Sequence, residues 1–168
     1  MNTSTTRRSL ATVLVVIAAI GASACSRSVD ALADRRHAVA TKSAKVTPFD
    51  LDATTHRFLP KPSGGVQQVL SDDPTNVVQI DLVRAHLQQE LTKFQRGDFS
   101  DPSSIHGDAM PGVAELSKAG RDGSLTVSFE ALPDGAQLIF TSDAPGVVAA
   151  LQRWFRAQKS DHGAHIAP

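Results

Sequence analysis

Histidine is the residue type that gives this sequence most of its chemical potential. An imidazole can ligate a transition-metal ion, and its charge changes more readily near neutral pH than that of other side chains. The sequence has no Cys pair suited to zinc, no glycine-rich phosphate loop and no Gly-x-Ser-x-Gly segment. Chemistry would therefore depend on six histidines, namely His37, His56, His86, His106, His162 and His165.

Two groups of residues could supply further ligands beside the imidazoles. His86 and Glu90 are four residues apart in a helical pattern, so they share one side of that helix and could chelate an ion or form a hydrogen bond. His106, Asp108 and Met110 share an expected loop, where a thioether would suit copper and a carboxylate would suit zinc. The alternative for this loop is structural, with Asp108 capping a helix and Met110 filling the core.

The expected orientation of His56 follows from an internal repeat with an offset of 71 residues, as between Phe58 and Phe129. The offset makes His56 equivalent to Val127, on the core-facing side of a clearly alternating strand. His56 is therefore expected to point inward, as a buried structural residue or as part of a metal or proton site. The other matching segments are Pro62-Ser63-Gly64 with Pro133-Asp134-Gly135, and Ser71-Asp72-Asp73-Pro74 with Ser142-Asp143-Ala144-Pro145.

Each copy of the repeat reads as a strand, a turn, a second strand and an amphipathic helix. Proline and glycine set the turns, and Asp with Pro suits the first turn of a helix. The predicted strands span 54–59, 66–70, 125–131 and 136–141, and the main helices span 74–96 and 145–159. Residues 98–123 are expected to form a loop with one short helix near 113–119. The duplicated unit predicts an α+β fold with a four-stranded antiparallel sheet and helices on one face.

The N-terminal residues carry the parts of an export signal. Arg7 and Arg8 precede an apolar stretch over 11–21, which is shorter than the ~20 residues of a membrane-spanning helix. Ala22-Ser23-Ala24-Cys25 then resembles the lipobox of bacterial lipoproteins, in which the cysteine becomes an acylated first residue carrying chains such as palmitate. Cys25 is thus the predicted lipidation site, and ordinary cleavage after Ala24 is the alternative. The paired arginines also resemble a twin-arginine signal, so the export route stays open.

These patterns divide the chain into four parts. They predict a signal peptide over 1–24, a lipidated cysteine with a flexible tether over 25–47 that is partly helical around 29–40, one α+β domain over 48–163 and a mobile tail over 164–168. Loss of two signal arginines lowers the basic count from 17 to 15 against 17 acidic residues, a net charge of −2. A nucleic-acid partner would require a basic face and is not expected. The expected partners are the extracytoplasmic or periplasmic face of a membrane, reached through the lipid, and an envelope protein.

Four stretches between residues 48 and 163 are distinctive, and together they resemble a family of small secreted bacterial proteins often labelled aspartate carbamoyltransferase. The resemblance implies that His56, His86, His106 and His162 belong to the family pattern, whereas Gln152 stands where many members carry another histidine. The Ser-Thr-Arg-Thr-Arg loop and the His-Pro-x-Gln segment of that enzyme are absent. The stretches are Pro-Phe-Asp-Leu-Asp-Ala-Thr-Thr-His at 48–56, Gly-Asp-Phe-Ser-Asp-Pro at 97–102, Ile-His-Gly-Asp-Ala-Met-Pro-Gly at 105–112 and Asp-His-Gly at 161–163.

Three functional hypotheses follow from the sequence. The favoured one is a lipid-anchored envelope protein that binds zinc or copper. The second is a non-enzymatic interaction module whose histidines are structural, and the third is the carbamoyltransferase activity that the family label implies. Imidazoles gathered around one point would favour a metal, whereas imidazoles each bonded to backbone or carboxylate would favour the module. The candidate metal ligands are His56, His86, Glu90, His106, Asp108, Met110 and His162.

Overall fold

The computed structural model describes residues 20–162, so the expected signal peptide up to residue 19 and the expected tail over 164–168 lie outside the described residues. None of the described helices combines the length and apolarity that crossing a membrane requires. In chain order the elements are α1 (Ile20–Ser43), a 3-10 turn (Leu51–Ala53), β1 (Thr54–Lys61), β2 (Gly64–Ser71), α2 (Val77–Phe94), α3 (Ser100–His106), α4 (Val113–Asp122), β3 (Thr126–Leu132), β4 (Gly135–Thr141) and α5 (Pro145–His162).

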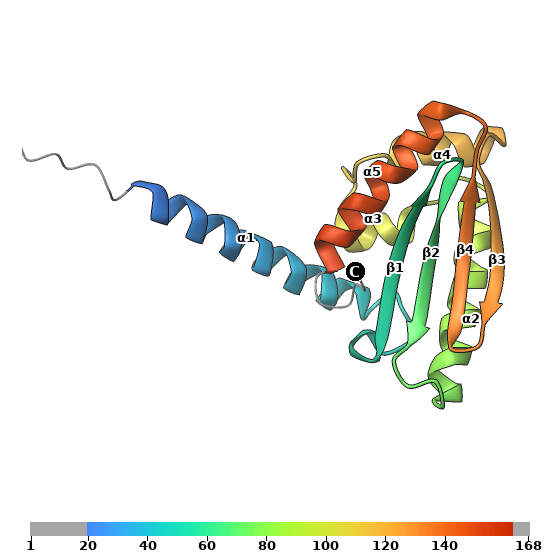
Figure 1. The fold of residues 1–168 in the computed structure, drawn as a ribbon, viewed down its shortest axis with the longest axis horizontal. Helices are drawn as coiled ribbons and strands as arrows, with labels where there is room; N and C mark the ends of the chain where they lie inside the picture. The colour runs from blue at the N-terminus through green and yellow to red at the C-terminus, as the bar shows by residue number, and fades with distance from the viewer. Residues whose placement is uncertain (1–19, 163–168) are drawn as a thin grey trace, which may run out of the picture.

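The strands form one antiparallel sheet in the order β1-β2-β4-β3, which confirms the predicted fold class (Figure 1). The strand registers repeat with the offset found in the sequence. Phe58 pairs with Gln67 in the first hairpin, and Phe129 pairs with Leu138 in the second. Gln67 and Leu138 also face each other where β2 joins β4. The two strand–strand–helix units are therefore related by an approximate two-fold axis through this central pair.

The core lies between one face of the sheet and helices α2 and α5. Alternate residues of a strand share a face, and Ala136, Leu138 and Phe140 of β4 are all fully buried. Val83 of α2 and Trp154 of α5 are equally inaccessible and belong to the same apolar cluster. Burial of each large apolar side chain contributes about 1.5–3 kcal/mol, so this layer supplies most of the stability of the fold.

The prediction of a loop over residues 98–123 was wrong in part, because α3 precedes the expected short helix. The Asp98 carboxylate accepts a hydrogen bond from the Ser100 N–H at 2.9 Å, close to where the helix begins. Pro102 falls in the first turn, where the missing N–H has no helical partner to lose. Gly107, with φ of 97°, follows the last residue of α3 and ends it. This short helix carries His106, which was expected in a loop.

The segment expected to be a flexible tether is helical and partly packed. Helix α1 extends away from the domain, and its C-terminal turns contact α3 and α5 (Figure 1). Val39 and Ser43 are buried at this junction. Alanine, arginine and lysine favour helix, and a helix presents these two buried residues on one side. Cys25 falls within α1, at a position whose side chain lies outside the described part.

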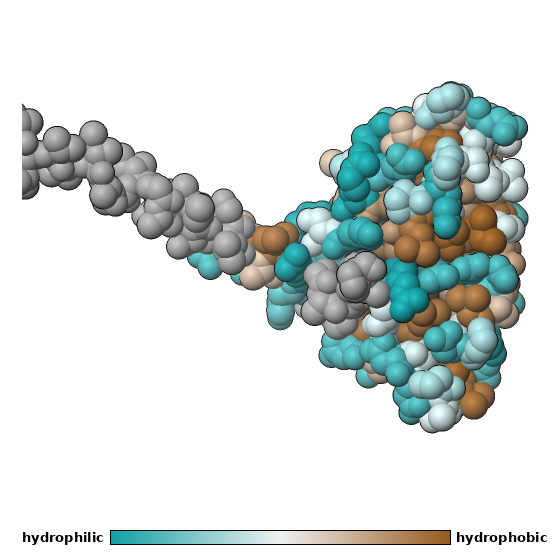
Figure 2. Space-filling model, viewed as in Figure 1, coloured by the Kyte–Doolittle hydropathy of each residue, from teal (hydrophilic) through white to brown (hydrophobic). Residues whose placement is uncertain are grey.

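The surface of the domain offers few large apolar side chains. Figure 2 shows hydrophilic groups interspersed with apolar ones on the face that it presents. In the part of the chain that the structure describes, Val77 and Val78 at the start of α2 are the large hydrophobic residues that are exposed. Two neighbouring valines form a much smaller patch than protein interfaces use.

Candidate functional site: a histidine-lined cavity

A small cavity lies at the end of the domain where α1 packs, between the first hairpin and helices α2, α3 and α5. Its volume is about 60 Å³. An apolar cavity of roughly 150 Å³ accommodates benzene, so this one suits an ion or a few water molecules rather than a larger organic compound. Phe49, Phe58 and Phe94 contribute apolar walls. The titratable side chains that line the cavity are His56, His86, Glu90, Asp101, His106 and His162.

Three of these histidines come together from distant parts of the chain. The ring centroids of His56 and His162 are 5.0 Å apart, as are those of His106 and His162. Two imidazoles on one tetrahedral zinc ion have centroids about 5 Å apart, because Zn–N bonds are ~2.0–2.1 Å long. Within residues 20–162, however, no three His, Cys, Asp or Glu side chains are arranged to hold an ion as they stand. Joint ligation would require side-chain rotation.

His56 points inward, as the repeat predicted. It is 5% exposed, and it pairs in register with Val69, which is buried on the same face of the sheet. Its ring lies 6.2 Å from that of Phe49, and the Phe49 ring lies 5.5 Å from that of His86. Aromatic side chains therefore enclose the imidazoles on this side and restrict their access to solvent.

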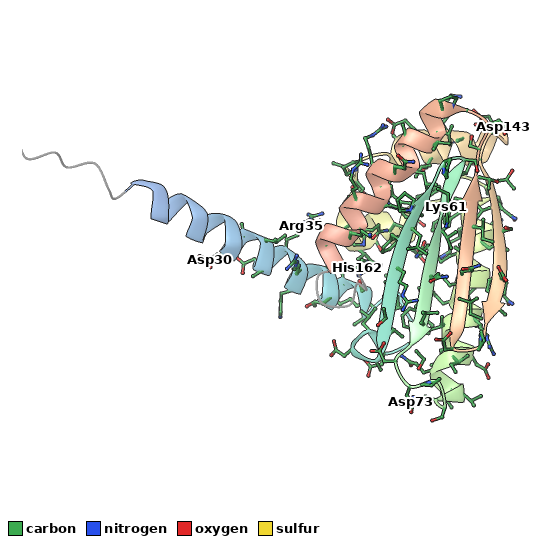
Figure 3. All side chains as sticks on the ribbon, in the orientation of Figure 1. Asp30, Arg35, Lys61, Asp73, Asp143 and His162 are labelled. Atoms are coloured by element: carbon green, nitrogen blue, oxygen red, sulfur yellow. The ribbon has the colours of Figure 1, made fainter. Side chains whose placement is uncertain are left out.

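His106 is positioned by a buried carboxylate that belongs to a larger ion pair. Its Nδ1 lies 2.8 Å from Oδ2 of Asp161, and Asp161 is 3% exposed. Arg35 of α1 binds the same carboxylate through two nitrogens, at 2.5 and 2.6 Å, and Figure 3 shows Arg35 close to the C-terminal end of α5. If Nδ1 carries the proton that this bond uses, Nε2 keeps a lone pair for a ligand.

The electrostatics of this group favour a neutral imidazole facing an ionised acid. Burial lowers the pKa of His106 and outweighs the opposing effect of the Asp161 carboxylate. Burial also pushes the pKa of Asp161 upward, but the hydrogen bonds from Arg35 and His106 outweigh it and hold that pKa below its usual range. His106 is therefore neutral at physiological pH, which is the form that binds a metal.

A second polar group lies along the part of the cavity wall that α2 and α3 form. Lys93 contacts Glu90 at 3.2 Å and also binds Asp101, and Glu90 is 5% exposed. Burial, with a further contribution from the hydrogen bond to Asp101, raises the pKa of Glu90 to about 7. Burial also lowers the pKa of the neighbouring His86. At neutral pH this wall therefore holds a carboxyl group that is protonated in part of the molecules.

The structure separates the predicted ligands into two sets. His56, His86, Glu90, His106 and His162 all line the cavity, whereas Asp108 and Met110 do not. Asp108 is exposed, and Met110 is buried in the apolar cluster, where its side chain packs as a core residue. The N-cap of α4 is Gly112, so the alternative capping role for Asp108 is also wrong.

Sequence reasoning missed two carboxylates, one that lies on α3 and one whose partner lies on α3. Asp101 contacts Lys93 from α3, and Asp161 contacts His106 from α5. The repeat contained a signal for Asp161, because the offset of 71 makes it equivalent to Glu90. Both are buried acids on the inner side of their helices. No comparable signal marked Asp101, whose partners depend on the unpredicted helix α3.

Comparison of the chain with protein-family models, with curated proteins and with solved structures found no match. The resemblance to small secreted bacterial proteins therefore stays a prediction. The histidine-lined cavity and the N-terminal residues are the features that bear on function.

Proposed function

We propose that this protein is a lipid-anchored cell-envelope protein whose domain binds a transition-metal ion, zinc or copper, in the histidine-lined cavity. The observation that supports this most is the convergence of His56, His106 and His162 from β1, α3 and α5. Imidazole is a preferred ligand of both metals. Burying three imidazoles among apolar side chains costs free energy, because each buried polar group requires a partner. A structural purpose alone therefore explains the arrangement less well than ligand binding does.

The surroundings of His106 are those that a metal ligand needs. Metal-bound histidines commonly donate their second N–H to a carboxylate, which fixes the ring and raises its basicity. Asp161 would serve this purpose for His106, with Arg35 holding the carboxylate in place from α1. Outer partners of this kind typically affect metal affinity by about 10–100-fold.

Placement in the envelope rests on the N-terminal residues. Lipidation of Cys25 would use the sole cysteine of the chain, leaving no thiol for metal ligation or a disulfide. Changing Cys25 to Ser is expected to release the protein from membranes into the soluble envelope fraction. Mass spectrometry of the mature N-terminus provides the direct measurement, and an unmodified cysteine there would contradict the anchor.

The strongest rival is the interaction module with structural histidines. The His106–Asp161 contact favours it, because a buried imidazole bonded to a carboxylate is satisfied without a metal. The two proposals differ in what added metal does to stability. A carbamoyltransferase activity has less support, since a cavity of about 60 Å³ is small for two organic substrates.

The decisive experiment is thermal unfolding of the protein, made without a histidine tag, with and without Zn²⁺ or Cu²⁺. At a free-ion concentration 100 times the dissociation constant, binding should add about 2.7 kcal/mol to stability. His56→Ala and His106→Ala should lose most of this gain. His37→Ala is the matched control, because His37 is exposed on α1 and does not line this cavity. Unchanged melting of the wild type, with no metal found by elemental analysis, would leave the module as the better account.

A further inference from the structure

The face of the sheet opposite the core, here called the open face, carries a band of apolar side chains. Phe58 and Leu138 point into the core, so their neighbours along the strands point to the open face. There Leu59 lies beside Val66, and Val66 lies beside Ile139. Each of these three is partly buried, because it is shielded by its neighbours in the row. Figure 2 shows apolar groups gathered over the strands, whereas the solvated face of an antiparallel sheet is commonly polar.

The neighbouring row of the open face carries opposite charges at its two ends. Arg57 of β1 stands at one edge of the sheet and Glu130 of β3 at the other, with Gln68 and Gln137 between them. Gln68 donates a hydrogen bond to Gln137 at 2.7 Å, and Gln137 donates one to Glu130 at 2.6 Å. Arg57 and Glu130 are exposed, and neither forms an ion pair with another residue that the structure describes. The central amides therefore have partners within the face, whereas the two edge charges are available to a second molecule.

The charged row is complementary to itself under one two-fold rotation. When two copies stack with their open faces together about an axis parallel to the strands, the rotation exchanges the β1 and β3 edges. Arg57 then lies opposite Glu130 of the second copy at both edges, and Val66 lies opposite Ile139 of the second copy in the centre. An axis across the strands would instead place Arg57 opposite Arg57 of the second copy, and like charges across an interface are unfavourable. The charges therefore select one arrangement.

We infer that the open face binds a second copy of this chain, giving a dimer with two-fold symmetry. Stacked sheets pack about 10 Å apart with their strands within about 30° of each other. Four strands spaced by ~4.8 Å, with seven residues in each of β3 and β4, give a face of about 19 by 24 Å. Two such faces cover about 900 Å², below the ~1,200 Å² of stable complexes, so the dimer is weak and reversible. This inference is independent of the cavity and of the lipid.

The test measures self-association of residues 25–168 by sedimentation velocity, with Cys25→Ser in every variant so that no lipid contributes. The otherwise unchanged chain is expected to form dimers with a micromolar dissociation constant. Arg57→Glu and Glu130→Arg each place like charges together at both edges and should weaken association at least about tenfold. The double variant exchanges the charges between the edges and should regain the original affinity within about threefold. Arg156→Glu is the control, because it makes the same charge change at an exposed position on α5.

Each outcome bears directly on the dimer. A chain that stays monomeric at millimolar concentration would overturn it, and so would association that Arg57→Glu weakens no more than the control does. A double variant as weak as either single variant would overturn the two-fold arrangement. Circular dichroism confirms that each variant is folded. Val66→Thr gives a second test, because it removes an apolar contact while keeping a β-branched residue in the strand, and it should weaken association several-fold.

Discussion

The two strand–strand–helix units share their register but differ in what they present to the interior. At equivalent positions the first unit has His56 and Gln67 where the second has Val127 and Leu138. Valine and leucine fill the core without needing partners, whereas histidine and glutamine must be satisfied. In the strands, the second unit thus shows that apolar residues satisfy the fold at these two positions, where the first unit has polar residues instead. These polar groups face the cavity.

The helices that follow the hairpins give a second comparison, between two equivalent buried acids. Glu90 of α2 and Asp161 of α5 lie at the same place in the repeat and are similarly buried. Asp161 is bound by both nitrogens of an Arg35 fork, and its pKa lies below the usual range. Glu90 shares one lysine with Asp101, and burial raises its pKa to about 7. At neutral pH the two equivalent acids therefore differ in protonation, because Asp161 is ionised whereas Glu90 is protonated in part of the molecules.

The largest expected effect tests whether the second unit carries the stability. Phe140 is fully buried and belongs to the central apolar cluster. Phe140→Ala should destabilise the metal-free protein by about 3–5 kcal/mol, because it removes apolar burial and leaves a void. Urea unfolding measures this loss. A loss below about 1 kcal/mol, roughly a third of the lower bound of this range, would show that the core of this unit is not the main source of stability.

The second-largest expected effect tests the difference in protonation between Glu90 and Asp161. The folded pKa of Glu90 is about 7, above its ordinary value of 4.5, so folding favours the protonated form. Its contribution is fully present below pH 4.5 and is lost as pH rises to about 7. A shift of this size corresponds to about 3 kcal/mol. Glu90→Gln should therefore lack the decline in stability that wild type shows across this pH range. Above pH 7 the variant should be more stable than wild type.

Asp161→Asn is the matched control for Glu90→Gln, and it should act in the opposite direction. A carboxyl whose folded pKa is depressed stabilises the protein above its unfolded pKa, and that contribution is lost as pH falls through the folded pKa. Asp161→Asn should therefore be less stable than wild type at neutral pH, where Arg35 loses its ionised partner. Chemical unfolding of both variants across pH measures the contrast. Parallel pH profiles for Glu90→Gln and wild type would contradict the assigned protonation of Glu90.

The smallest expected effect on stability comes from making the first unit resemble the second. His56→Val installs the residue of the equivalent position and should change the stability of the metal-free protein by less than about 1 kcal/mol, because valine suits a buried strand position. The same variant should lose the stabilisation that added Zn²⁺ gives wild type. Thermal melts with and without Zn²⁺ measure both quantities. A large loss of metal-free stability would mean that His56 is a structural residue.

Sequence reasoning reached the sheet and the orientation of His56 because both depend on local alternation and on the repeat. The offset between Phe58 and Phe129 was enough to assign equivalent positions. It missed α3, since a seven-residue helix containing Ser, Asp and Pro has too few apolar residues to show a period. The His106–Asp161 contact joins residues 55 apart and depends on that helix. The packing of α1 was missed because two buried residues, Val39 and Ser43, and one ion pair through Arg35 are too few to give a periodic apolar pattern.

Helix α1 would set the distance between the domain and a lipid carried by Cys25. Cys25 and Arg35 lie on this one helix, and Arg35 is fixed to the domain through Asp161. The ten residue steps from Cys25 to Arg35 rise about 15 Å along a helix. A flexible chain would let the domain move freely relative to the bilayer, whereas a rigid helix would fix the height of the domain above it. With a lipid on Cys25, the cavity would be held at about that height above the bilayer.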